Sequence, residues 1–250
     1  MKRIAVLNSN VLKIVAAITM LIDHLGVLVF PQYVIFRIIG RISFPLYAFM
    51  IAEGCKYTKN RLRHFLTVFG LGSVFQLVFW LVTRVEYMGI LITFSVSILL
   101  IYVLQDFKNQ LNQGKLYSKT LMGALFVLLV TLAFVVTESV IFDYGIMGIM
   151  LPVLFSVPSI ITRSNEQGKS GFARVVDSNL TRVLIASAVL VLYAVKEGQG
   201  VYYYALLSSP FILLYSGRRG KLRLKWFFYI FYPTHLVAIY LIFYLLKLMA

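Results

Sequence analysis

Nine long apolar runs constrain this chain more than any other feature of its sequence. Each is close to the length, about 20 residues, that lets an α-helix cross the hydrocarbon core of a bilayer. A helix satisfies its backbone hydrogen bonds internally, which lipid requires because it offers no partners. The sequence therefore predicts an all-α, polytopic membrane bundle of about nine transmembrane helices, at 11–30, 34–54, 65–83, 90–106, 120–137, 145–161, 181–195, 202–216 and 226–248. No repeat or Gly/Ser-rich linker separates these runs, so we expect a single membrane domain over 1–250.

The overall composition agrees with a membrane protein. Hydrophobic residues make up 60% of the chain and charged residues 13%, whereas soluble domains average roughly 45–50% and about 25%. The formal net charge is +15, but Lys and Arg stand in short clusters between the apolar runs. A nucleic-acid-binding protein would instead gather them in a stripe or on one helix face. We therefore expect the lipid bilayer to be a partner of this chain and nucleic acid not to be one.

The basic clusters predict the orientation in the membrane. Eighteen Lys and Arg residues fall in the N-terminal segment and in every second loop after it, against three on the other side. Basic residues are retained in the cytoplasm during insertion. We therefore expect the N-terminus to be cytoplasmic and, with nine spans, the C-terminus to be outside.

Four ionisable residues stand together in the first two predicted spans. Asp23 and His24 lie near the outer end of the first span, and Arg37 and Arg41 form an i, i+4 pair in the second. A charge inside the membrane costs several kcal/mol on most scales, roughly 2.5 or more at the bilayer centre, so such residues are functional candidates by default. A short turn at 31–33 joins the two spans as antiparallel neighbours, which brings Asp23 or His24 close to the arginines.

This charged group has two interpretations. Asp23 can form a buried structural ion pair with one of the arginines. Alternatively, because one carboxylate cannot balance two guanidinium groups, Arg37 and Arg41 bind an anionic ligand or reacting group. His24 is a candidate general base, since imidazole changes protonation near neutral pH, although a membrane histidine can also be a simple hydrogen-bonding group.

Further polar residues lie in or beside other spans. His235 follows Pro233 in the last span and either lines a cavity or makes a structural hydrogen bond. Glu53, at the end of the second span, is expected to pair with a cytoplasmic-side Lys or Arg. Asp143 either caps the sixth span or lines an outward-facing acceptor site. We expect His64, in a basic loop, to be solvated, and we expect no metal site because the chain has three histidines and no metal-ligand spacing.

Several short motifs resemble the TraX family. They occur in the family's order over nearly the whole chain, at 12–26, 36–49, 58–61, 91–95, 142–148 and 231–236. Seven residues stand on family motif positions: Asp23, His24, Arg37, Arg41, Glu53, Asp143 and His235.

The resemblance implies a function. TraX is known for N-terminal acetylation of conjugative pilin, which implies a membrane acetyltransferase with acetyl-CoA as donor and a protein or envelope-glycan acceptor, in the inner (cytoplasmic) membrane of a bacterium. Acyl transfer from a thioester needs a base and cations for the developing oxyanion or for the CoA phosphates. The resemblance thus makes His24 the base, Asp23 its electrostatic partner, Arg37 and Arg41 the anion-stabilising pair, and His235 a second polar wall. The basic cytoplasmic loops are candidates for docking the CoA phosphates.

Two other classes of function stay open. A secondary transporter or lipid flippase would use the arginine pair to bind an anionic substrate, although an odd number of spans without a repeat does not favour the inverted-repeat architecture. A non-catalytic assembly protein for an envelope or secretion machine is the third possibility.

Overall fold

The computed structural model describes residues 6–113, 115–162, 171–221 and 225–249. In these ranges the chain is almost entirely helical, and eight helical segments are long and apolar enough to cross a membrane. They confirm the all-α membrane bundle. The elements are α1 (Ser9–Leu28), α2 (Val34–Gly40), α3 (Ser43–Tyr57), α4 (Arg61–Thr83), β1 (Tyr87–Met88), α5 (Ile90–Gln113), α6 (Leu116–Ser139), β2 (Ile141–Phe142), α7 (Gly145–Thr162), α8 (Gly171–Val176), α9 (Asn179–Glu197), η1 (Gly200–Ser208), α10 (Ser209–Leu213) and α11 (Lys225–Met249).

The second predicted span is broken into α2 and α3 at Arg41 and Ile42. Pro45, in the first turn of α3, explains the break. A proline has no N–H to donate to the carbonyl four residues earlier, here that of Arg41, and its ring clashes with that carbonyl. The hydroxyl of Ser43 donates to the Gly40 carbonyl at 2.8 Å and satisfies one of the groups that the break frees. The sequence predicted one continuous helix over 34–54, so this interruption is a correction.

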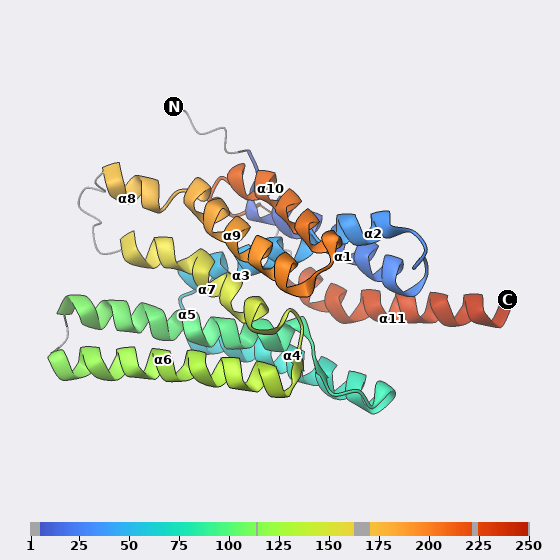
Figure 1. The fold of residues 1–250 in the computed structure, drawn as a ribbon, viewed down its shortest axis with the longest axis horizontal. Helices are drawn as coiled ribbons and strands as arrows, with labels where there is room; N and C mark the ends of the chain where they lie inside the picture. Colours follow the sequence, from blue (N-terminus) through green and yellow to red (C-terminus); the bar gives the residue numbers. More distant parts are fainter. Residues whose placement is uncertain (1–5, 114, 163–170, 222–224, 250) are drawn as a thin grey trace. The chain divides into compact units, whose positions relative to one another are not determined.

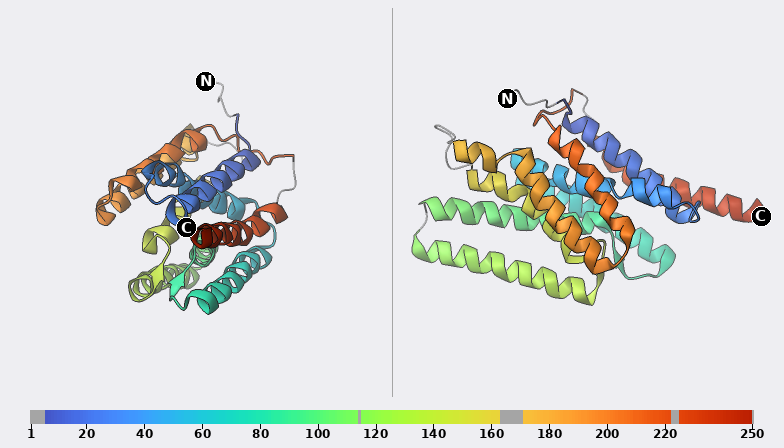
Figure 2. Two further views of the ribbon diagram at one scale, coloured as in Figure 1. Left: turned by 90° about the vertical axis from the view of Figure 1, so that its right-hand side faces the viewer. Right: turned by 45° about the horizontal axis from the view of Figure 1, so that its top comes forward.

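The predicted span at 202–216 is a shorter helical segment in two parts, the 3₁₀ helix η1 and the α-helix α10. A 3₁₀ helix rises about 2.0 Å per residue against 1.5 Å for an α-helix, so the segment extends over roughly 25 Å. Its first part lies beside Arg41, whose guanidinium is 5.1 Å from the Tyr202 ring, and its end reaches Leu7, which forms a β-bridge with Tyr215. The segment therefore runs back along α1 to the point where α1 begins (Figure 2, right, orange). It is shorter than the eight membrane-crossing segments, so the ninth crossing stays a prediction.

The contacts divide the chain into two compact units, Met1–Met50 with Ala186–Ala250, and Ile51–Ile185. We call them unit 1 and unit 2 and describe each by itself. The expectation of a single domain over 1–250 stays a prediction.

Unit 2 is built around α5, which packs against α4, α6 and α7 (Figure 1). Its core is aliphatic and centres on Ile98, Ile101 and Ile149, which are fully or almost fully buried. One short parallel strand pair, β1 with β2, links the loop after α4 to the loop before α7. α6 buries little of its surface, as a helix that faces lipid does.

Unit 1 is held by close contacts of α1 with α2 and α11. Two glycines permit the approach of α2 to α1. A Cβ on Gly26 would overlap the side chain of Phe36, and a Cβ on Gly40 would overlap the side chain of Asp23. α1 begins with a capped turn, because the Asn8 side chain accepts hydrogen bonds from the amides of residues 10 and 11 at 3.0 and 3.2 Å. α1 and α2 thus form a tight helical hairpin that carries the four ionisable residues.

Candidate functional site

Asp23, Arg37 and Arg41 form one ionic cluster in unit 1. Arg37 Nη1 lies 2.9 Å from Asp23 Oδ2, and Arg41 Nη2 donates to both Asp23 oxygens at 3.1 and 3.2 Å. The hairpin geometry creates this cluster, since Asp23 packs against Gly40, the residue before Arg41. The expected proximity of Asp23 to both arginines is confirmed. With one carboxylate and two guanidinium groups, the cluster carries an excess positive charge.

The two arginines have different surroundings. The side chain of Arg41 is 5% exposed and stacks over the Tyr202 ring, whereas that of Arg37 is 31% exposed. A guanidinium has five N–H donors. Arg41 is therefore enclosed by Asp23 and Tyr202, whereas the Arg37 side chain is partly exposed and has donors beyond the one that faces Asp23. Sequence reasoning gave the two arginines the same role and did not distinguish them.

His24 and His235 form a second pair in unit 1. His24 Nδ1 lies 3.0 Å from His235 Nε2, and the rings are 5.0 Å apart at a tilt of 41°. His235 comes from α11, one turn beyond Phe231, whose ring stacks on it at 4.8 Å. His235 is buried and His24 half-buried. The two residues lie 211 positions apart in the chain, so no local pattern could have joined them.

The hydrogen bonds of His235 fix the protonation pattern of the pair. Its Nδ1 lies 2.7 Å from the carbonyl oxygen of Phe231. A carbonyl only accepts, so Nδ1 carries the proton and Nε2 of a neutral His235 is an acceptor. His24 must then donate from Nδ1, which leaves the lone pair of the neutral His24 ring on Nε2. His235 thus favours one tautomer of neutral His24, in which Nε2 carries the lone pair that a general base could use.

The resemblance implied Asp23 as the partner of His24, but in the structure His24 bonds to His235. Both oxygens of Asp23 receive hydrogen bonds or ion pairs from the arginines, whereas the Nδ1 atom of His24 bonds to His235. The expectation that Asp23 would hold an arginine is confirmed. The expectation that a structural hydrogen bond engages His235 is also confirmed, while its alternative as a cavity wall stays a prediction.

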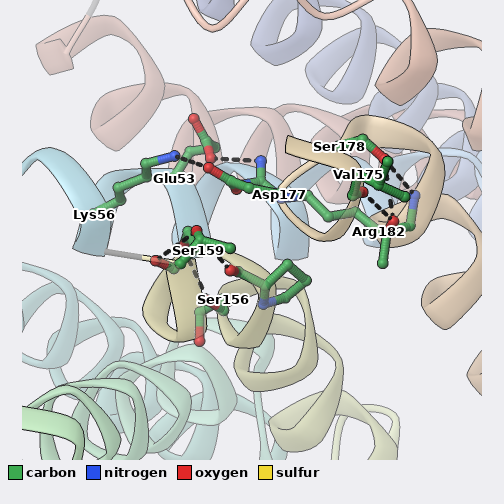
Figure 3. A network of polar contacts seen from close by, with 11 residues as sticks. Glu53, Lys56, Ser156, Ser159, Val175, Asp177, Ser178 and Arg182 are labelled. Atoms are coloured by element: carbon green, nitrogen blue, oxygen red, sulfur yellow. Dashed lines mark hydrogen bonds and ion pairs between the residues drawn. The ribbon is translucent and has the colours of Figure 1, made fainter. Parts of the chain in front are cut away.

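Glu53 belongs to a separate ionic network in unit 2 (Figure 3). It accepts a hydrogen bond from Arg182 Nη1 at 2.9 Å, and Arg182 Nη2 donates to Asp177 at 2.8 Å. Lys56 completes the network, 3.8 Å from Asp177. Arg182 and Glu53 are both buried. The predicted pairing of Glu53 with a Lys or Arg is confirmed, and the cytoplasmic side of that residue stays a prediction. Sequence reasoning did not single out Asp177, because an acidic residue is common in a polar loop.

Asp143 also lies in unit 2, between β2 and α7. Its amide donates to the Met88 carbonyl at 2.9 Å, and its carbonyl oxygen accepts from the Thr93 hydroxyl at 3.5 Å. The next two residues, Tyr144 and Gly145, have positive φ values of 60° and 52°, so the turn before α7 is left-handed. Both interpretations of the Asp143 side chain, as a cap and as an acceptor contact, stay predictions.

His64 is not the solvated residue that the sequence predicted. Its Nδ1 lies 2.8 Å from the hydroxyl of Tyr102 in α5, and the side chain is half-buried. Arg61 stands over the same tyrosine ring at 5.2 Å and pairs with Asp106. The packing of α4 on α5 brings these residues together, and the sequence around His64 does not predict this contact. Among the described residues, no three His, Cys, Asp or Glu side chains are grouped so that they could hold a metal ion.

Comparison with known proteins gives one family. The family described as "TraX protein" matches residues 8–243. No match was found among curated proteins or among solved structures.

Proposed function

This chain belongs to the TraX family, and from that membership and the site geometry we propose that it is a membrane-embedded acetyltransferase. It transfers an acetyl group from acetyl-CoA to an extracytoplasmic or membrane-borne acceptor, such as a pilin N-terminus or an envelope glycan or lipid. Membership of the family supports a role in conjugation.

The observation that carries the proposal is the oriented imidazole of His24. A general base must present a lone pair to the acceptor and be held in one tautomer. His24 meets this requirement because its Nδ1 is engaged by His235 at 3.0 Å and its Nε2 is left as the basic nitrogen. His235 acts as a positioning residue.

The chemical step balances with these groups. The acceptor is a hydroxyl or a neutral amine. Nε2 of His24 takes its proton while the acceptor oxygen or nitrogen attacks the thioester carbon. The carbonyl oxygen becomes an oxyanion, which Arg37 stabilises with the donors that its partial exposure leaves open. When the tetrahedral intermediate collapses, the C–S bond breaks and the CoA sulfur leaves with the proton held by His24. The products are the acetylated acceptor and CoA.

A second candidate function rests on the excess charge of the ionic cluster. Two guanidinium groups share one carboxylate, and an anion transporter or flippase needs such a site as much as an acyltransferase does. In that case the anion would cross the membrane unchanged, and His24 would be dispensable.

Transfer of labelled acetyl groups separates the two functions. Membranes that contain the protein are incubated with acetyl-CoA labelled in the acetyl group, and the label in protein, glycan and lipid fractions is measured. We expect His24→Gln to lose most of the incorporation, and His64→Gln, which alters a half-buried histidine outside the site, to keep it. Equal incorporation by His24→Gln and the unmodified protein would refute the proposal. Arg37-dependent anion flux in liposomes without a covalent product would establish the alternative.

A further inference from the structure

The loop that follows α10 is fixed to the start of α1. Residues 214–221, which we call the basic loop, run beside the segment that precedes α1. Leu7 donates to the Leu214 carbonyl at 3.0 Å and accepts from the Ser216 amide at 2.8 Å, and the Ser9 amide donates to the Arg218 carbonyl at 3.0 Å. These bonds, within unit 1, set the position of the loop relative to α1.

Two glycines shape this loop. Gly217 has a φ of 71°, a conformation that other residues adopt at a cost. Gly220 lies against Asn10 so closely that a Cβ would overlap the Asn10 side chain. The loop therefore has a defined conformation and is more than a cluster of basic residues that sets the orientation in the membrane.

The basic loop exposes three cations, Arg218, Arg219 and Lys221. Unit 1 has two acidic residues in its sequence, Asp23, which the arginine pair engages, and Glu197, which ends α9 at the other end of η1 and α10. No acidic side chain of unit 1 is thus available to the loop. In unit 2, by contrast, cytoplasmic-side cations such as those of the network in Figure 3 are paired with carboxylates. Within unit 1, the positive charge of the basic loop thus has no acidic side chain to balance it and is open to an anionic ligand.

α1 connects this loop to the candidate base. From Ser9, where the loop is attached, to His24 the helix rises roughly 22 Å at 1.5 Å per residue. The pantetheine arm of CoA, when extended, has a comparable length. A CoA molecule whose phosphates lie at the loop can therefore place its thioester near His24.

We propose that the basic loop is the docking site for the 3′-phospho-ADP portion of acetyl-CoA, with Arg218, Arg219 and Lys221 binding its phosphates. Arginine binds phosphate through two parallel hydrogen bonds and lysine as a point charge. The inference rests on the proposed acetyltransferase function and assigns its donor site. It also makes α1 the element that sets the distance between donor headgroup and reacting carbon.

Binding of adenosine 3′,5′-bisphosphate, the headgroup of CoA without the pantetheine arm, tests the assignment. The full chain is placed in nanodiscs of zwitterionic lipid, and binding is measured by titration calorimetry. The test variant is Arg218→Gln/Arg219→Gln/Lys221→Gln. The matched control is Lys108→Gln/Lys115→Gln/Lys119→Gln, which removes the same charge from unit 2 on the side that is expected to be cytoplasmic.

We expect the dissociation constant to rise about tenfold to a hundredfold in the test variant, which corresponds to about 1.4–2.8 kcal/mol in total, and to stay within about twofold in the control. In the transfer assay, the KM for acetyl-CoA should rise in the test variant at an unchanged kcat, because the chemical groups at His24 are untouched. Equal dissociation constants for the test variant and the control would overturn the inference.

The outcomes also separate this inference from the proposed function. If labelled acetyl transfer proceeds but headgroup binding ignores the basic loop, the donor site is elsewhere and the acetyltransferase proposal stands. If the headgroup binds through the loop but no acetyl group is transferred, the docking site is supported and the reaction is refuted. If the test variant loses co-purified anionic lipid and keeps its affinity for the bisphosphate, the loop binds lipid headgroups and the inference fails.

Discussion

Replacing Asp23 by asparagine should disturb unit 1 more than any other single change of charge. The Asp23 carboxylate pairs with both Arg37 and Arg41. An asparagine side chain has nearly the same shape, but it would leave two guanidinium groups opposite each other without this counter-charge. Breaking a buried ion pair by removing one partner costs about 3–5 kcal/mol. For a chain of this size, that corresponds to a fall in Tm of about 6–20 °C, at about 2–4 °C per kcal/mol.

A second substitution should restore part of this loss, and by different amounts for the two arginines. The Arg41 side chain is 5% exposed and that of Arg37 31% exposed, so Arg37 can turn its charge toward water or headgroups while Arg41 cannot. In the Asp23→Asn background, Arg41→Gln should therefore recover at least half of the lost Tm, and Arg37→Gln clearly less.

Thermal unfolding in nanodiscs, followed by circular dichroism for the four proteins of each double-mutant cycle, measures these effects. A fall in Tm of less than about 2 °C for Asp23→Asn is what an exposed ion pair predicts, and it would refute the buried cluster. Equal recovery by the two second-site changes would refute the distinction between the arginines.

Three further predictions concern other parts of the fold. Gly40→Ala should cost about 1–3 kcal/mol because its Cβ overlaps Asp23, whereas Gly70→Ala, whose Cβ meets no atom within 4 Å, should be neutral or stabilising by up to about 1 kcal/mol; equal thermal stability of the two variants contradicts the close approach of α1 and α2. Arg182→Gln removes the buried cation of the network in Figure 3, and we expect a loss of about 3–5 kcal/mol, measured by thermal unfolding; a loss below about 1 kcal/mol would show that the network is solvated. Single cysteines at Gln199 and at Arg219, in the cysteine-free background, should react with an impermeant thiol reagent from opposite sides of the membrane; reaction from the same side would mean that η1 and α10 do not cross.

Sequence reasoning reached the ionic cluster but not the imidazole pair, and the difference is one of distance along the chain. Asp23, Arg37 and Arg41 lie within one helical hairpin, where helix periodicity and a short turn determine which side chains meet. His24 meets His235 through the packing of α11 on α1, 211 positions later, and nothing in either span specifies that contact. Pairings of this kind depend on the whole bundle.

The fold was predicted to a similar degree. Apolar length located the membrane helices correctly, since lipid enforces it. Pro45, which causes the break at Arg41, can be read from the sequence, but a pattern of apolar residues does not reveal its effect on the helix. The 3₁₀ form of η1, whose Tyr202 ring lies beside the Arg41 guanidinium, has no equivalent sequence signal.

The two pairs of the site also differ in when they can form during synthesis. Unit 1 is made from the two ends of the chain. At about 5–20 residues per second, the arginines follow Asp23 out of the ribosome within a few seconds, so the Asp23 carboxylate can pair with them inside the first hairpin long before the last span is made. The neutral His24 waits roughly 10–40 s for His235, 211 positions later. A nascent chain that stops before α11 would thus lack the partner of His24, so the imidazole pair is completed only with the last span to be inserted.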